Sequence, residues 1–260
     1  MKRLLLACAL LVLPSCATFA AENPWVGTWK LDPSKGHLVG DTFDYSNAPN
    51  GLIHYSDGST ASYDFGLDGK EYKSWGNQTT AWTATGTNTW NSVVKQDGVV
   101  IYETRRELSA DGKTLTITTT SNKPDGSPSN DVTVYTRIGS GTGLIGKWRS
   151  TKVEIPAPSA LVISSPSPGA LRFESPSYKV TFEGKTDDTD LAVKGPTVPP
   201  GYTASVTATS PRTLAYVYKL DGKVDSYNID VLAADGKSFT SVSWNPGKES
   251  EKTTLVFVKQ

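Results

Sequence analysis

Hydrophobic and polar residues alternate along much of the chain, with the period of two that belongs to β-strands. Tyr63, Phe65 and Leu67 alternate with Ser62 and Asp64. Two further segments show the same alternation, 114–118 and 178–183. No stretch shows a convincing helical period of about 3.6 residues. The pattern therefore predicts an all-β protein whose strands have one apolar face and one solvated face.

Asp-Gly pairs separate several of these strand-like segments and indicate hairpin turns. A two-residue hairpin turn needs a positive φ, which glycine adopts without steric cost. The aspartates of these pairs are Asp57, Asp68, Asp97, Asp111, Asp125, Asp221 and Asp235. Short strands joined by hairpins in sequence order form an antiparallel meander. Without a covering helix, the meander either closes into a barrel or folds into a sandwich, and we favour the closed or nearly closed barrel because closure removes exposed edges.

The strand pattern occurs twice, because short motifs of the first half recur in the second half in the same order. Gly-Thr-Trp at 27–29 is answered by Gly-Lys-Trp at 146–148. Three further matches keep nearly the same spacing, pairing 95–98 with 219–222, 110–113 with 234–237, and 134–137 with 256–259. Two copies of one small domain explain this best. We therefore expect two tandem antiparallel up-and-down barrels, each beginning with a Gly-x-Trp strand.

The repeat and an N-terminal leader divide the chain into four expected parts. These are a signal peptide at 1–21, a first barrel at 22–138, a linker at 139–143 and a second barrel at 144–260. The linker reads Gly-Ser-Gly-Thr-Gly, which is a flexible composition. The two domains could therefore move relative to each other unless they share an apolar interface.

The leader has the composition of an export signal. Lys2 and Arg3 precede the apolar run 4–13, which is followed by small residues. This run is shorter than the roughly 20 apolar residues of a membrane-spanning helix, so no transmembrane segment is expected. Export predicts a periplasmic or secreted protein.

Two cleavage sites are open in this leader. Thr-Phe-Ala at 18–20 suits an ordinary signal peptidase that cuts before Ala21. Leu-Pro-Ser-Cys at 13–16 resembles a lipoprotein box, which would leave the protein anchored to the membrane by a lipid on Cys16. We favour simple cleavage, with the lipid anchor as the alternative.

Composition excludes several classes of partner. Both cysteines, Cys8 and Cys16, lie in the leader, so no disulfide framework and no cysteine-rich metal site is expected. The chain has 26 basic and 26 acidic residues, which gives no electrostatic reason to expect nucleic acid or an acidic membrane surface as a partner. We expect neither a metal nor a cofactor.

The repeated features resemble the lipocalin and wider calycin pattern: Gly-x-Trp on the first strand, a meander of hairpins, and a basic residue on the last strand. The segment 27–35 also looks like the start of short lipocalin-like domains in exported bacterial proteins. The resemblance implies that each first-strand tryptophan plugs one end of its barrel beneath the basic residue. The implied barrel-closing pairs are Arg137 over Trp29 and Lys259 over Trp148.

The chain also departs from that pattern. It has no Thr-Asp-x-x-Tyr-like turn and no clear helix before the last strand. Lys259 is a weaker partner for an indole than arginine, because an ammonium lacks the planar fork that stacks on the ring. The ligand chemistry of the family is therefore not transferred to this chain.

Aromatic residues concentrate in the first half. Aromatic side chains line ligand pockets because they offer a large rigid contact area, but they also fill small barrels. We predict that a small hydrophobic or amphipathic molecule binds in the first barrel, with packing of a filled, structural barrel as the alternative. The candidate ligand-binding residues are Tyr63, Phe65, Tyr72, Trp75, Trp82 and Trp90.

His54 is the candidate for acid–base chemistry, on the strand face opposite Tyr55. A general base needs a carboxylate partner, and those near in sequence are Asp41, Asp44, Asp57 and Asp64. Such a pair would serve a hydratase, isomerase or esterase-like barrel enzyme, which is the alternative function. An ordinary strand histidine is favoured, so no catalytic residue is assigned. The charged run at 103–107 is interpreted as an exposed face.

Overall fold

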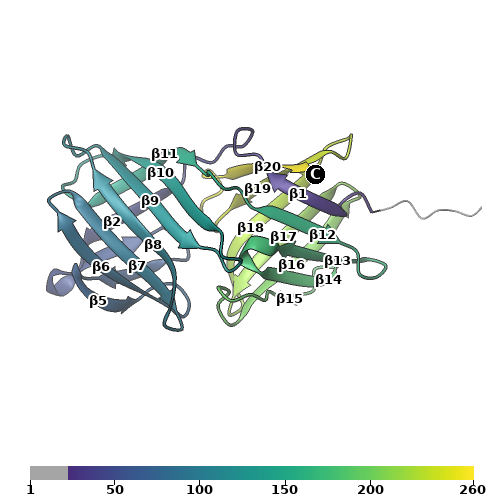
Figure 1. The fold of residues 1–260 in the computed structure, drawn as a ribbon, viewed down its shortest axis with the longest axis horizontal. Coiled ribbons are helices and arrows are strands. Elements are labelled where there is room, and N and C mark those ends of the chain that lie inside the picture. Colours follow the sequence, from purple (N-terminus) through teal and green to yellow (C-terminus); the bar gives the residue numbers. More distant parts are fainter. Residues whose placement is uncertain (1–22) are drawn as a thin grey trace, which may run out of the picture.

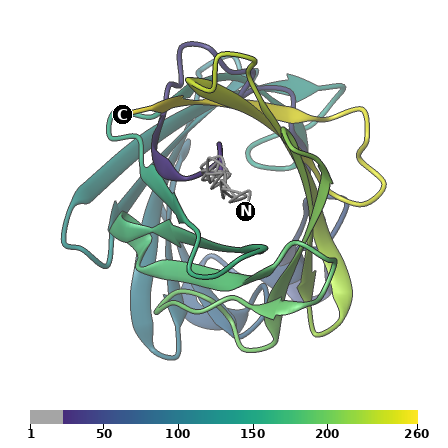
Figure 2. The ribbon, with the colours of Figure 1, turned by 90° about the vertical axis from the view of Figure 1, so that its right-hand side faces the viewer.

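The computed structural model describes residues 23–260, which form two antiparallel β-barrels in tandem (Figure 1). Each barrel is a single ten-stranded sheet that is nearly closed, and each has its own hydrophobic core. The predicted all-β fold of two tandem antiparallel barrels is confirmed. Viewed from the end at which β1 begins, the strands of the second barrel form a ring (Figure 2).

The first barrel has the strand order β4-β3-β2-β11-β10-β9-β8-β7-β6-β5. A short 3-10 helix, Pro49–Gly51, joins β2 to β3. The two ends of the sheet, β4 and β5, lie next to each other. The strands are β2 (Thr42–Asn47), β3 (Ile53–Ser56), β4 (Ser62–Phe65), β5 (Asp68–Lys73), β6 (Gln78–Gly86), β7 (Thr89–Gln96), β8 (Val99–Leu108), β9 (Thr114–Asn122), β10 (Pro128–Ile138) and β11 (Gly146–Glu154).

The second barrel has the strand order β14-β13-β12-β1-β20-β19-β18-β17-β16-β15. Its ends are joined by two backbone hydrogen bonds of 2.8 Å that Thr181 and Lys194 exchange. Pro176–Tyr178 form a 3-10 helix. The strands are β1 (Gly27–Leu31), β12 (Ala160–Ser164), β13 (Ala170–Ser175), β14 (Val180–Lys185), β15 (Leu191–Ala192), β16 (Tyr202–Ser210), β17 (Thr213–Leu220), β18 (Lys223–Leu232), β19 (Ser238–Trp244) and β20 (Thr253–Lys259).

The two Gly-x-Trp strands have exchanged barrels. β1 opens the first repeat but lies between β12 and β20 of the second barrel, whereas β11 opens the second repeat but lies between β10 and β2 of the first. The chain therefore crosses between barrels after β1 and again after β11. Each of the expected ranges, 22–138 and 144–260, contains one strand of the other barrel. The expected linker at 139–143 is the hairpin loop between β10 and β11.

The open ends of the barrels face each other across a seam. Hairpin loops of the first barrel bind loops of the second: Gln96 Nε2 donates to the carbonyl of Val198 at 3.1 Å, and the Asp125 amide donates to that of Ser177 at 3.2 Å. The ends that carry Trp29 and Trp148 lie away from this seam, because they are formed by the opposite ends of the strands. Each barrel is therefore closed at the end that lies away from the other barrel, its pole, and open at the end that faces the other barrel.

Replacing Trp29 tests whether the two Gly-x-Trp strands have exchanged barrels. Removal of a fully buried tryptophan costs about 3–5 kcal/mol, and Trp29 is fully buried. In Trp29→Ala, hydrogen exchange followed by mass spectrometry should become faster in β12 and β20, which flank β1. The matched variant Trp148→Ala should instead accelerate exchange in β2 and β10. Faster hydrogen exchange in β2 and β10 of Trp29→Ala would contradict the placement of β1 in the second barrel.

Candidate functional site

Each pole is closed by a tryptophan beneath a basic side chain, but the pairs differ from those expected. Arg137 Cζ lies 4.1 Å from the ring centroid of Trp148, and Lys259 Nζ lies 5.1 Å from that of Trp29. The expected pairs, Arg137 over Trp29 and Lys259 over Trp148, are wrong because β1 and β11 have exchanged barrels. The kind of contact is as expected, and each tryptophan is fully buried.

The glycine of each Gly-x-Trp motif makes room for the basic side chain. Gly27 and Gly146 have φ values of +149° and +138°, which side-chain-bearing residues rarely adopt. A Cβ on Gly27 would lie 2.5 Å from Lys259 Cε, and one on Gly146 would lie 2.6 Å from Arg137 Nη1. The positive φ favours glycine in both motifs, and the absence of a Cβ leaves the basic side chain its place over the indole.

Arg137 also fixes the loop between β10 and β11. Its Nε donates to the carbonyl of Gly112 at 2.8 Å, its Nη2 to that of Gly143 at 2.7 Å, and its Nη1 to that of Ile145. Burial lowers the pKa of this guanidinium. Arginine satisfies three carbonyls through its planar fork while it stacks on the indole. These contacts identify Arg137 as a structural residue of the pole.

The predicted aromatic residues gather in the first barrel, with one exception. Phe65 and Trp82 are buried and stack with ring centroids 4.1 Å apart, and Trp90 is buried in the same cluster. Tyr63 and Tyr72 pack against this cluster. These five residues share one interior, as expected.

Trp75 lies apart from the other candidates. It follows β5 in the loop before β6, and its ring centroid is 6.0 Å from that of Tyr202 in the second barrel. Trp75 lines a cavity of about 490 Å³ between the barrels, together with Ser62 and Lys223. The structure therefore places Trp75 at the seam and outside the interior of the first barrel.

Arg106 is a residue of this interior that the sequence interpretation missed. Its Cζ lies 3.9 Å from the ring centroid of Trp82. Its Nε donates to the Tyr45 hydroxyl at 3.2 Å, and its Nη1 donates to Ser92 Oγ at 3.0 Å and to Thr104 Oγ1. The guanidinium is thus held by neutral hydroxyl groups over an aromatic face.

The interpretation of the whole run 103–107 as an exposed face is wrong at this position. Thr104 and Leu108 are buried, and Arg106 shares their face of β8. Glu103, Arg105 and Glu107 are exposed on the other face, where Arg105 pairs with Glu107 at 2.8 Å. The alternation along β8 could have identified Arg106 as an inward residue. It lies two positions from Thr104 and two from Leu108, and every second residue of a strand points to the same face.

No carboxylate neutralises Arg106 among residues 23–260. Each ion pair within 4.0 Å in that part of the chain involves other residues. A cation in an aromatic interior is poorly solvated, so its attraction for an anion is stronger than in water. The interior of the first barrel therefore holds the Arg106 guanidinium, without an ion-pair partner, among packed aromatic rings.

Tyrosine hydroxyls supply further polar groups in the interior of the first barrel. Burial raises the pKa of each, so all are neutral and able to donate hydrogen bonds at physiological pH. Charge-assisted hydrogen bonds from a guanidinium and hydroxyls are the contacts that a carboxylate accepts best. These tyrosines are Tyr45, Tyr55, Tyr63, Tyr102 and Tyr135.

A cavity of about 280 Å³ lies at the open end of the first barrel. Phe43, Tyr55 and Tyr135 line it from the first barrel, and Ser243 and Trp244 from the second. Its wall also carries charged side chains, those of Asp41, Asp57, Glu251 and Lys248. Its wall therefore joins the aromatic interior of the first barrel to the loop between β19 and β20.

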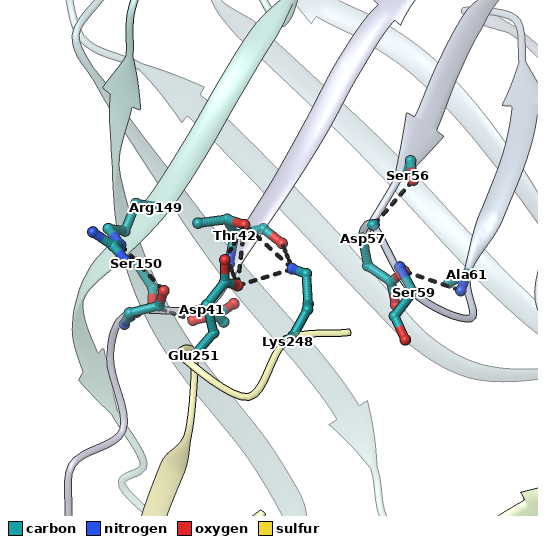
Figure 3. A network of polar contacts seen from close by, with 12 residues as sticks. Asp41, Thr42, Ser56, Asp57, Ser59, Ala61, Arg149, Ser150, Lys248 and Glu251 are labelled. Carbon is teal, nitrogen blue, oxygen red and sulfur yellow. Dashed lines mark hydrogen bonds and ion pairs between the residues drawn. The ribbon is translucent and has the colours of Figure 1, made fainter. Parts of the chain in front are cut away.

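A polar network holds that loop over the cavity (Figure 3). Glu251 accepts hydrogen bonds from the amide and hydroxyl of Thr42, each at 3.0 Å. Lys248 Nζ donates to the Thr42 carbonyl at 2.7 Å and pairs with Glu251 at 2.9 Å. Burial acts to raise the pKa of Glu251, but the hydrogen bonds from Lys248 and Thr42 outweigh it and lower that pKa.

His54 lies on the outer face of the first barrel. Its Nδ1 is 2.6 Å from Asp64 Oδ1, and its Nε2 is 3.2 Å from Ser62 Oγ. The side chains of His54 and Asp64 are 37% and 46% exposed. Asp64 is thus the carboxylate partner among the four candidates, and the three groups form a proton-relay arrangement in water.

No protein-family model matches the chain, and a search of curated proteins finds no match.

Among residues 23–260, no three His, Cys, Asp or Glu side chains are grouped to hold a metal ion. No helix within the same range is long and apolar enough to cross a membrane. Fold and site define a two-barrel all-β protein with a guanidinium, that of Arg106, among the packed aromatic rings of its first barrel.

The seam network makes a testable contribution to stability. In the folded state the pKa of Glu251 lies below its ordinary value of 4.5. Its ionised form therefore stabilises the seam above that pH, and this contribution is lost as the pH falls through the lowered pKa. Glu251→Gln should remove this pH dependence, lower the free energy of unfolding at pH 7 by about 1–3 kcal/mol, and speed hydrogen exchange at 244–253.

Glu249→Gln is the matched control, because Glu249 is exposed in the same loop. It should leave both the pH dependence and the hydrogen exchange unchanged. Equal behaviour of the two variants would show that the network does not hold the loop.

Proposed function

We propose that the protein is an exported, lipocalin-like binding protein that holds a small amphipathic anion inside its first barrel. The observation that carries the proposal is Arg106, a cation on the inner face that no described carboxylate neutralises. The tryptophan poles support the lipocalin-like assignment. Export rests on the leader sequence, which lies outside the described residues, and implies the periplasm or secretion, with a lipid anchor at Cys16 as the alternative.

We expect the ligand to have a polar and an apolar part, because the interior of the first barrel offers both kinds of contact. Arg106 and the tyrosine hydroxyls suit a carboxylate or a similar anion. The stacked rings of Phe65 and Trp82 suit a hydrocarbon body. An anion at Arg106 would also compensate a half-buried charge that has no carboxylate partner.

A titration with decanoate and decanol tests this proposal. Decanoate should quench tryptophan fluorescence, since Trp82 lies against Arg106. Arg106→Met should weaken decanoate binding by about tenfold or more, because a hydrogen bond to a charged group contributes about 1.5–3 kcal/mol. Binding of decanol should change little.

Arg105→Met is the control, since it removes the same charge from the exposed face of β8. It should bind decanoate like the unchanged protein. Equal loss in both variants would mean that the effect is one of net charge, and an absence of decanoate binding would favour filled, structural barrels.

Ester hydrolysis is a second candidate function, favoured by the relay of Ser62, His54 and Asp64. Ser62 lines the cavity between the barrels, so a substrate there could reach its hydroxyl. The exposure of His54 and Asp64 lowers the gain from such a relay, because water screens the charges that develop. This function requires that Ser62→Ala abolish hydrolysis of p-nitrophenyl acetate above the rate without protein.

A further inference from the structure

The second barrel contains a cavity of about 220 Å³. Phe173 and Phe182 form one wall, stacked with ring centroids 4.7 Å apart. The ring of Tyr216 meets Phe173 edge-on at 5.7 Å and stacks with Tyr218 at 6.2 Å. Aromatic rings therefore line much of this cavity, which is partly open.

The polar end of the cavity is formed by Asp230, a carboxyl that is only 4% exposed. Asn228 Nδ2 donates to Asp230 at 2.7 Å, and Ser241 Oγ donates to Asn228 Oδ1 at 2.8 Å. Within residues 23–260, no basic side chain lies within 4.0 Å of Asp230. Burial raises the pKa of this carboxyl and outweighs the hydrogen bonds with neighbouring side chains, which act to lower it.

Tyr216 adds a second polar group to the same end. Its hydroxyl is buried beside Asp230. Burial, and then the neighbouring Asp230, raise the pKa of this hydroxyl well above its ordinary value, so it stays neutral. The cavity thus has a carboxyl and a tyrosine hydroxyl at its polar end.

The repeat relates this group to the site in the first barrel. The spacing that places Gly98 opposite Gly222 also places Arg106 opposite Asp230. Both residues point inward, from the corresponding strands β8 and β18. One position of the repeat therefore carries a cation in one barrel and a carboxyl in the other.

We propose that the second barrel binds a small organic ammonium ion, with its charge against Asp230 and its body between the aromatic rings. A carboxyl and several ring faces are the groups that recognise such a cation. Ser243 lines both this cavity and the cavity at the seam, which gives a route of entry between the barrels. The proposal concerns a second site and does not depend on the anion site at Arg106.

Isothermal titration calorimetry with 2-phenylethylammonium tests the proposal. The unchanged protein should bind this probe, and Asp230→Asn should weaken binding by about tenfold or more. Asp190→Asn removes the same charge from an exposed position of the second barrel and should bind normally. Hydrogen exchange of β18 in Asp230→Asn checks that the barrel remains folded.

Decanoate separates this proposal from the proposed function. Asp230→Asn should bind decanoate unchanged, and Arg106→Met should bind 2-phenylethylammonium unchanged. The second site is overturned if the unchanged protein does not bind the ammonium probe, or if a folded Asp230→Asn binds it equally well. Failure of decanoate alone would overturn only the anion site.

Discussion

A basic side chain that crosses a glycine and covers a buried tryptophan is the contact on which the architecture depends. Gly146 and Gly27 leave space for Arg137 and Lys259, and those two side chains seal the poles. Because the Gly-x-Trp strands are exchanged, each seal also joins distant parts of the chain. Neither barrel is complete without a strand from the other repeat, so the two barrels are tied by covalent crossings and by their loops.

Sealed poles leave the seam as the place where the interiors meet solvent. The loops at the open ends bind each other, and the pair of Lys248 and Glu251 fixes one loop over the mouth of the first barrel. A ligand proposed for either barrel would enter between these loops. The contacts that dock the barrels would then also set the access to their interiors.

The sequence was sufficient to predict the fold class, because the alternation of apolar and polar residues is a local pattern that recurs in both halves. It could not predict the exchange: the strands of Trp29 and Trp148 offer nearly the same backbone and side-chain contacts, so only the path of the chain distinguishes the two arrangements. Arg106 was missed because the charged residues around it were interpreted together as one exposed face. The alternation along β8 does predict its inward position. Trp75 was misplaced because aromatic content alone cannot separate a strand interior from a loop.

Comparison of the two repeats separates what the fold requires from what the interiors do. At the poles both copies keep glycine, tryptophan and a basic residue, because sealing allows little else. Inside, Arg106 corresponds to Asp230, and their surroundings differ in charge and in hydrogen bonding. Packing alone gives no reason to bury opposite charges at one position, since an apolar residue would cost less there. The two proposed ligands of unlike charge would account for this difference between the interiors, which packing of the core does not explain.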